Sequence, residues 1–278
     1  MKKNVIRALA CVATLWLVAF GRMNAAAQEG EQLFWQGKMY EMLVTPLQQN
    51  QQVKDFVRQL ATGKKRASCS RGYVGYWSIV DDMLYLDSIR TEEKTIIPQD
   101  DSVLSEFCTD GRMAATWVST SLRVVSGKEI ASETMGFNRY YDHEDFINVK
   151  MGKVGKVESY EQKCLIEKLK DSEKDKLMND FMTAIRPELA KRFPDESMKT
   201  YTLLYAEGVQ YDGFDDQNNP TGVKLTMRNG GKNIESEMMK YFAEELCKYL
   251  LEKRYIPLYI LKDKVAQNSW TIRIPQEK

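Results

Sequence analysis

Few side chains in this sequence have the types and spacing that chemistry requires. His143 is the single histidine, and it lies among carboxylates in the segment Asp142-His143-Glu144-Asp145. Because imidazole titrates near neutral pH, His143 is a candidate general base or metal ligand. In an extended segment, however, neighbouring side chains point to opposite faces. Asp142 and Glu144 would then not chelate a metal together with His143, and the pattern favours a solvated acidic turn.

A second polar cluster occurs in the segment YDGFDDQNNPTG, residues 211–222. Its oxygen-bearing side chains are Asp212, Asp215, Asp216, Asn218 and Asn219. Oxygen ligands suit calcium, but the ligand spacing of an EF-hand is not met. Asp, Asn, Gly and Pro are also the residues of ordinary turns. We therefore expect a plain loop, and the sequence predicts no metal site and no cofactor.

The common catalytic motifs are missing from the sequence. It contains no G-x-S-x-G elbow, no HExxH helix, no P-loop and no GxGxxG. Two carboxylates can catalyse hydrolysis without any sequence signature. An envelope hydrolase that acts on glycan or peptide is therefore kept as the alternative function.

Four cysteines follow residue 27, and they are widely spaced. Separations of 39, 56 and 83 residues are too long for a CxxC redox or zinc motif. In an oxidising compartment they could form up to two disulfides in three possible pairings, and buried free thiols are the alternative. These residues are Cys69, Cys108, Cys164 and Cys247.

The first 27 residues have the zones of a cleavable secretory signal. A basic start precedes an apolar run of 13 residues, Ala8–Phe20, and small residues follow up to Ala27. A helix that crosses a bilayer needs about 20 apolar residues. We therefore expect cleavage after Ala27, a mature chain that does not span the membrane, and a location in the periplasm, on the cell surface or outside the cell.

The charges are almost balanced, with 40 basic and 39 acidic residues distributed along the chain. Nucleic-acid binding needs a concentrated basic face for the phosphate backbone. The sequence has no such concentration, so a nucleic acid is not an expected partner.

The clearest structural signal is RGYVGYWSIVDDMLYLDSI, residues 71–89. Apolar and aromatic residues alternate with period 2 on both sides of Asp81-Asp82, which predicts a β-hairpin. Further strands are predicted in pairs, and the spacing within 53–60 predicts a short amphipathic helix. The predicted pairs are 33–35 with 39–44, 114–118 with 122–125, and 146–149 with 154–157. Residues 28–160 are thus expected to form a mainly antiparallel β domain.

After Tyr160 the composition becomes rich in Lys, Glu, Leu and Met. Helices interrupted near Pro187 are predicted over 161–192, and the strongest helix pattern spans 233–253. Strands are predicted at 201–205, 223–227, 258–261 and 270–274. The predicted fold class is α+β, in which residues 28–160 precede a smaller β-β-α-β domain that follows a helical linker within 161–278.

Five aromatic residues are the candidate binding residues. They could form a stacking platform for sugars or a protein partner, or they could fill the core between strands. If one face is exposed, Tyr76 and Tyr85 are the better candidates, because Trp77 is in register with Ile79. The five residues are Tyr73, Tyr76, Trp77, Tyr85 and Trp117.

Two parts of the chain resemble known families. The R-G-Y-x-x-x-W-x-I…L-Y-L hairpin and the W…L-R-x-x-x-G segment, within about residues 31–158, resemble an uncharacterised family of exported bacterial proteins. That resemblance implies export but no particular activity. Residues 199–275, approximately, are similar in element order to the carboxy-terminal domain of the energy transducer TonB. The Pro-Trp-rich stretch of that family is reduced here to Tyr255-Ile256-Pro257, so energy transduction is not implied.

The expected function is that of an exported, non-enzymatic binding or interaction protein of the bacterial envelope. The missing catalytic motifs and the aromatic strand pairs favour it over the hydrolase. The expected partner is an envelope protein or a glycan.

Overall fold

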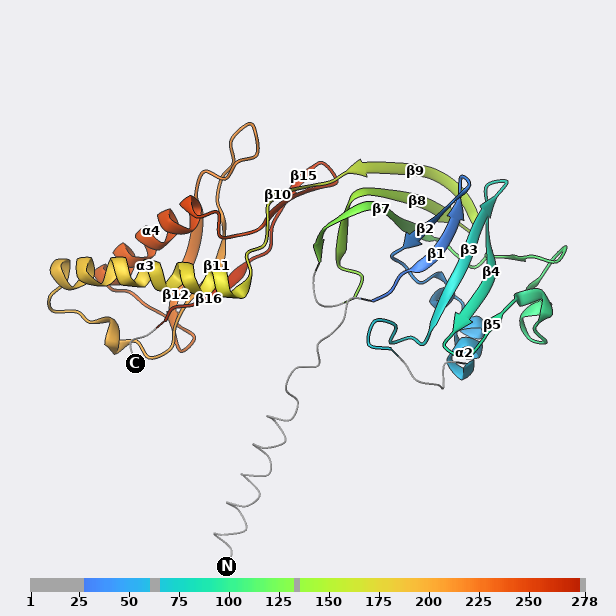
Figure 1. Cartoon of the computed structure of the whole chain (residues 1–278), viewed down its shortest axis with the longest axis horizontal. Coiled ribbons are helices and arrows are strands. Elements are labelled where there is room, and N and C mark those ends of the chain that lie inside the picture. The colour runs from blue at the N-terminus through green and yellow to red at the C-terminus, as the bar shows by residue number, and fades with distance from the viewer. Residues whose placement is uncertain (1–27, 61–65, 133–135, 276–278) are drawn as a thin grey trace, which may run out of the picture. The chain divides into compact units, whose positions relative to one another are not determined.

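A computed structural model describes residues 28–60, 66–132 and 136–275 (Figure 1). The predicted export signal, residues 1–27, lies outside the described residues. The fold is mostly β with several antiparallel sheets, as expected for an α+β protein. The chain divides into two compact units, with the boundary between Tyr160 and Glu161. No helix within the described part of the chain has the length and apolar character needed to cross a membrane.

The first unit is built on one large sheet. Its strand order is β3-β1-β2-β7-β8-β9-β4-β5, with β6 beside β4. Because β3 also pairs with β4, the pairings close into a ring. The pairing of β1 with β3 is parallel, and the other registers in this sheet are antiparallel. The elements are β1 (Glu31–Trp35), β2 (Lys38–Met42), α2 (Gln51–Leu60), β3 (Tyr73–Val80), β4 (Met83–Thr91), β5 (Thr95–Ile96), β6 (Met113–Ala114), β7 (Thr120–Ser132), β8 (Arg139–Lys150) and β9 (Lys153–Glu161), with 3-10 turns at Pro46–Gln49, Pro98–Asp100 and Leu104–Phe107.

Two-residue turns explain three of the hairpins. Asp81 and Asp82 join β3 to β4 with φ of 48° and 58°. Gln36-Gly37 and Met151-Gly152 likewise have positive φ at both turn positions. Paired positive φ values match the right-handed twist of the adjoining strands. The predicted strand pairs at 33–44, 71–89 and 146–157 are confirmed.

The predicted hairpin between 114–118 and 122–125 is wrong. Only Met113–Ala114 is a strand, and it pairs with β4, whereas β7 pairs with β2 and β8. Ala115 and Val118 are both fully buried and belong to the apolar core of the first unit. A turn, in which the Val118 amide donates to the Ala115 carbonyl at 2.9 Å, places both side chains in the core.

The second unit contains two helices and two small sheets. One sheet has the order β13-β12-β11-β16, and the other has the order β10-β14-β15. Buried side chains of both helices and of the first sheet form one apolar cluster, which includes Phe181, Phe242 and Ile272. The elements are β10 (Lys163–Ile166), α3 (Asp171–Arg192), a 3-10 turn (Met198–Thr200), β11 (Leu204–Tyr211), β12 (Val223–Asn229), β13 (Lys232–Asn233), α4 (Glu237–Glu252), β14 (Leu258–Leu261), β15 (Lys264–Ala266) and β16 (Trp270–Arg273).

The helix prediction over 161–192 needs two corrections. Lys163–Ile166 is a strand, β10, which pairs with β14. Helix α3 is continuous through Pro187 to Arg192. Pro187 is exposed, while Ile185 and Leu189 on either side of it are buried. The apolar contacts of these two residues hold the helix in place despite the backbone hydrogen bond that proline lacks.

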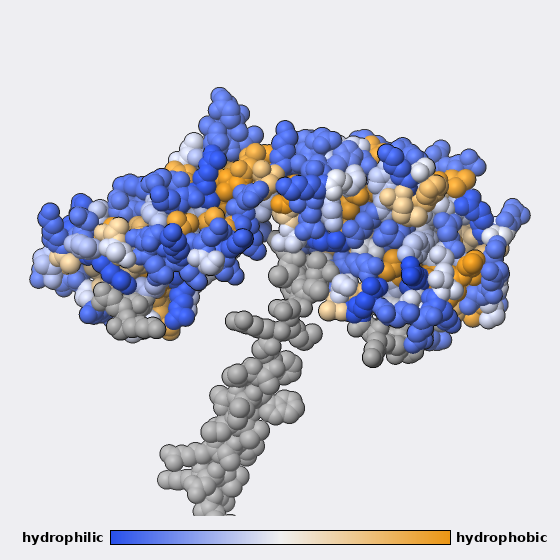
Figure 2. All heavy atoms as spheres, in the orientation of Figure 1, coloured by the Kyte–Doolittle hydropathy of each residue, from blue (hydrophilic) through white to orange (hydrophobic). Residues whose placement is uncertain are grey.

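Helix α4 confirms the strongest helix pattern of the sequence. Ser236 caps its first turn by accepting a hydrogen bond from the Met239 amide at 3.1 Å. The buried face consists of Met238, Met239, Phe242, Leu246 and Leu250. In Figure 2, hydrophilic residues cover most of the visible surface of each unit, in keeping with apolar faces that are turned inward.

Candidate binding site

Strand β3 separates the candidate aromatic residues into two groups. Tyr73 and Trp77 point into the core of the first unit and are 6% and 1% exposed. Tyr76, at the alternate position, is only partly buried. The predicted alternation therefore describes β3 correctly, with Trp77 on the core side and Tyr76 on the outer side.

Trp117 also packs against the core rather than forming an open platform. Its ring centroid lies 6.4 Å from that of Trp77. Its Nε1 donates to the carbonyl of Pro46 at 3.2 Å. Three of the five candidate residues, Tyr73, Trp77 and Trp117, thus serve the interior of the first unit.

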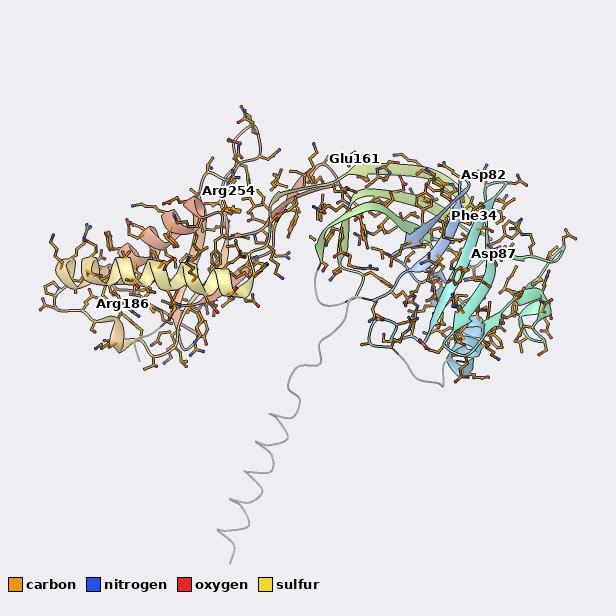
Figure 3. All side chains as sticks on the ribbon, viewed as in Figure 1. Phe34, Asp82, Asp87, Glu161, Arg186 and Arg254 are labelled. Atoms are coloured by element: carbon orange, nitrogen blue, oxygen red, sulfur yellow. The ribbon has the colours of Figure 1, made fainter. Side chains whose placement is uncertain are left out.

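The outer side of β1–β4 brings the other candidates together with residues that sequence reasoning missed. The register joins Met39 of β2 to Phe34 of β1, Phe34 to Ser78 of β3, and Ser78 to Tyr85 of β4. Residues paired in this way share a face of the sheet. Phe34 and Met39 are 46% and 55% exposed. We call the surface made by Phe34, Met39, Tyr76, Tyr85, Asp87 and Arg112 the β1–β4 face; Phe34 and Asp87 are labelled in Figure 3.

Arg112 is held in a fixed position on this face. Its guanidinium carbon lies 4.0 Å from the centroid of the Tyr85 ring. Its Nη2 donates to Ser78 Oγ at 3.0 Å and lies 3.6 Å from Asp87 Oδ1. Ser78 Oγ donates to Asp87 at 2.9 Å. The guanidinium thus covers one face of the Tyr85 ring, so a sugar could stack there only by displacing it.

A bulge in β4 places Asp87 in this arrangement. The register shifts so that Tyr76 pairs with Ser88 while Trp77 pairs with Leu86, which leaves Asp87 as the extra residue. Bulges redirect a side chain and interrupt the regular ladder. Local alternation in the sequence carries no signal for this shift, which is why Asp87 and Arg112 were not among the candidates.

Behind β3, a carboxyl group is buried in the first unit. Glu31 has no solvent exposure, and Trp77 Nε1 donates to its Oε2 at 2.6 Å. Burial raises the pKa of Glu31 to about 7, against the opposing effects of the Arg71 charge and the Trp77 hydrogen bond. A Cβ on Gly75 would lie 2.6 Å from Glu31 Oε2, so only glycine fits beside this pair.

Arg71 connects this carboxyl to the segment that precedes β1. Its Nε lies 3.9 Å from Glu31 Oε1, and neither of these two atoms has a hydrogen-bond partner. Its other nitrogens donate to the carbonyls of Glu29 at 2.7 Å and Gly30 at 3.1 Å. A charged residue before a strand gives no sequence signal of burial, so the Glu31–Arg71 pair could be found only from the structure.

Two further ion pairs crosslink the strands of the first unit. Arg123 on β7 binds Glu144 on β8 through two hydrogen bonds of 2.7 and 2.6 Å. Arg139 on β8 binds Glu41 on β2. Glu144 is 1% exposed. Because their partners are close and oppositely charged, these carboxylates are held as structural groups.

His143 lies in strand β8, opposite Ser126. The predicted acidic turn is therefore wrong: residues 139–150 pair with β7 instead of forming a turn. Nε2 of His143 lies 3.5 Å from Asp145 Oδ2, while Glu144 turns to Arg123. Neighbouring side chains of β8 thus point to opposite faces, as expected for an extended segment. Asp142 and Glu144 are therefore not placed to chelate a metal together with His143. Within the described ranges, no group of three or more His, Cys, Asp or Glu side chains is arranged to hold a metal ion.

The acidic loop at 211–222 is organised by its own hydrogen bonds. Asp215 Oδ1 accepts from the backbone amides of Gln217 at 2.9 Å and Asn219 at 2.8 Å. Hydrogen bonds from the Asn219 side chain and from these amides lower the pKa of Asp215. The side-chain oxygen of Asp215 is therefore used for turn formation, as the plain-loop interpretation predicted.

No disulfide joins the four cysteines in the described part of the chain. Cys69 is buried, and its Sγ donates to the Tyr73 carbonyl at 3.2 Å. Burial raises the pKa of Cys108 and of Cys247, which makes both thiols weaker nucleophiles.

With this geometry established, comparison with known proteins gives no relative. No family model, no curated protein and no solved structure matches this chain. We therefore infer the function from the chain's own residues.

Proposed function

We propose that this protein is exported to the bacterial envelope and acts there, without catalysis, by binding a partner protein through the β1–β4 face. The observation that carries the proposal is the exposure of Phe34 and Met39 beside Arg112, which is stacked on Tyr85. Aromatic residues, Met and Arg are enriched in protein interfaces. A pre-oriented guanidinium also loses little side-chain entropy when it binds.

The geometry favours a protein over a glycan. A sugar-binding platform needs an open aromatic ring, and Arg112 occupies one face of Tyr85. The exposed side chains beside it, Phe34 and Met39, offer apolar contact area that suits an apolar patch on a partner. A periplasmic or cell-surface location follows from the proposed signal.

Two family relationships form part of this proposal. The first unit, residues 28–160, would belong to the family of exported proteins with the R-G-Y-x-x-x-W-x-I hairpin. The second unit would share the fold of the TonB carboxy-terminal domain, and the order β11, β12, α4, β16 supports this relationship. The helical linker predicted at its start corresponds to α3, whose 22 residues are packed into the core of this unit.

Site-specific photocrosslinking in cells tests the binding surface. Benzoylphenylalanine at Phe34 or Met39 should give one discrete crosslinked protein. Leu203, which is 47% exposed in the second unit, provides a control position of similar exposure. The same product from all three positions would contradict a specific surface.

Affinity measurements with the crosslinked partner then test the chemistry. Phe34→Ser and Arg112→Gln should each weaken binding about tenfold or more if they are central contacts. Unchanged affinity in both variants, or saturable binding to a glycan array that requires Phe34, would refute a protein partner at this face. Export is tested separately by the intact mass of the envelope-bound protein, which should correspond to a chain that begins at Gln28.

A further inference from the structure

The second unit contains a surface groove that the proposed function does not use. It has a volume of about 300 Å³ and lies between α3 and α4, which are neighbours in this unit (Figure 1). Its lining residues recur every three or four positions along each helix, which places them on one side of that helix. Ligand pockets have volumes of about 300–1,000 Å³ and combine apolar and aromatic walls with a few polar groups. The groove has this composition.

The floor of the groove is apolar and aromatic. Phe181 and Ile185 are 5% and 6% exposed, and Tyr241 and Tyr249 are partly buried. The ring centroids of Phe181 and Tyr249 lie 5.1 Å apart, and the Tyr249 hydroxyl donates to the Leu177 carbonyl at 3.0 Å. These two contacts hold the Tyr249 ring in one orientation, so this wall of the groove is formed in advance of any ligand.

Two ring contacts give the order of the side chains along the groove. Phe181 of α3 contacts Tyr249 of α4, as described above. Phe193, the residue that follows α3, contacts Tyr241, and their centroids lie 5.9 Å apart. Because the later residue of one helix contacts the earlier residue of the other, α3 and α4 run in opposite directions.

This order places two carboxylates opposite each other in the middle of the groove. Glu188 lies between the two ring contacts on α3, and Glu245 lies between them on α4. Tyr241 and Tyr249 are each four residues from Glu245, which is one helical turn on either side. Two carboxylates and two aromatic rings therefore surround the same part of the groove.

The lining has more negative than positive charge. Its carboxylates are Glu188, Glu245 and Glu252, and its single ammonium group is that of Lys248. Lys248 binds Glu245 at 2.6 Å, and Lys253, which is outside the lining, binds Glu252 at 2.7 Å. Glu188 takes part in no ion pair within the described part of the chain. Selection for a cation therefore depends first on Glu188, whose charge no cation neutralises.

The aromatic rings of the groove already attract cations of the protein itself. The Arg192 guanidinium carbon lies 4.3 Å from the Tyr241 centroid, and Lys253 Nζ lies 5.6 Å from the Tyr249 centroid. Neither Arg192 nor Lys253 lines the groove. A positive charge near the face of an aromatic ring is favourable, and the gain increases when water is excluded.

We propose that this groove binds a small organic ammonium ion, whose charged group lies between Glu188 and Glu245 and whose apolar chain contacts Phe181 and Ile185. An ammonium group has three hydrogen-bond donors, which suits carboxylates on two sides. Lys248 is 70% exposed in its side chain and can turn toward solvent when a ligand takes its place at Glu245, since exposed ion pairs contribute little. A cavity of roughly 150 Å³ holds benzene, so the groove has room for an apolar part of about six to ten carbon atoms.

Methyl NMR of the purified protein, labelled at the methyl groups of Ala and Ile, tests the proposal. Titration with hexylammonium should shift the Ala184 and Ile185 signals together along one saturable curve, because both residues line the groove. Ile89 and Ile147, which are buried in the core of the first unit, should not move. Hexanol and hexanoate have the same chain without the positive charge, and they should bind about tenfold more weakly.

Two pairs of matched variants locate the site. Glu188→Gln should weaken hexylammonium binding about fivefold or more, while Glu244→Gln, at an exposed position of α4 outside the lining, should leave it unchanged. Ala184 lines the groove and is exposed, so Ala184→Trp should fill it and abolish the shift of Ile185. Ala190→Trp is the control, because Ala190 is exposed on the same helix but outside this groove.

The methyl signals of the core residues also show whether each variant is folded. Equal affinity for hexylammonium and hexanol, equal weakening by Glu188→Gln and Glu244→Gln, or binding that survives Ala184→Trp would each overturn the proposal. So would the absence of any saturable shift. None of these results depends on whether the β1–β4 face binds a protein.

Discussion

The two units of this chain stabilise their interiors by different means. Four of the five buried polar residues, Glu31, Ser78, Glu144 and Asp145, lie in the first unit. Both units have an apolar core, and that of the second unit packs two helices against a sheet. The first unit in addition encloses charged groups, so its stability also depends on their position and protonation.

The largest effect is expected from a cavity in the second unit. Phe242 is fully buried, and its ring centroid lies 5.5 Å from that of Phe181. Phe242→Ala should lower the free energy of unfolding of this unit by about 3–5 kcal/mol. Hydrogen exchange should show the loss in residues 161–275 and not in the first unit. Equal loss of protection in both units would show that they do not fold independently.

The next prediction concerns the pH dependence of the first unit. The pKa of Glu31 is about 7 in the folded state, compared with 4.5 in the unfolded chain. The folded state binds this proton more tightly than the unfolded chain does. The contribution of the protonated Glu31 to the free energy of unfolding is therefore complete below pH 4.5 and is lost as the pH rises through 7. Glu31→Gln should therefore match the wild type at pH 4 and exceed its unfolding free energy by about 3 kcal/mol at pH 8.

Urea unfolding at a series of pH values measures this difference. Glu93→Gln, at an exposed position, serves as the control and should follow the wild-type curve. Parallel curves for Glu31→Gln and the wild type across the whole range would contradict the buried proton.

A smaller effect is expected from one added methyl group beside the same carboxyl. Gly75→Ala would place a Cβ 2.6 Å from Glu31 Oε2 and 2.7 Å from Trp77 Nε1. Glu31 and Trp77 would have to move apart from the new methyl group. This displacement should lower the free energy of unfolding by about 1–3 kcal/mol and change the Trp77 fluorescence. Gly155→Ala, whose Cβ would have its nearest contact at 3.5 Å, should change neither stability nor fluorescence appreciably. If the two variants behaved alike, the close approach at Gly75 would be refuted.

The smallest effect concerns a local feature of the second unit. Ser236→Ala removes the acceptor for the Met239 amide at the start of α4. The expected loss of unfolding free energy is about 1 kcal/mol. Thermal unfolding of this variant beside Ser236→Asp, which keeps a capping oxygen, should show the loss for alanine alone. Identical melting temperatures would show that the cap contributes nothing.

Features with a local cause could be predicted from the sequence. The β3–β4 hairpin follows from period-2 alternation around Asp81-Asp82, and α4 follows from its apolar spacing. The prediction failed where a segment's conformation depends on distant partners. β10 is a strand because β14 lies beside it, and Ala115–Val118 turns because two of its side chains enter the core.

The residues of the candidate site also fall into two groups, those that the sequence pattern predicted and those that it did not. Alternation alone placed Trp77 inside and Tyr76 on the opposite side of β3, which the structure confirms. It gave no signal for Phe34 or Arg112, because their positions depend on the parallel β1–β3 pairing and on the short β6 strand beside β4.

The sequence by itself determined the β3–β4 hairpin, helix α4 and the inward-facing side of β3, since each depends on residues a few positions apart. Only the tertiary structure decided which strands close the sheet and that Glu31 is enclosed beside Trp77, 46 residues away. The physical reason is that burial and long-range pairing depend on which surfaces meet after the chain folds, and local periodicity does not encode that choice.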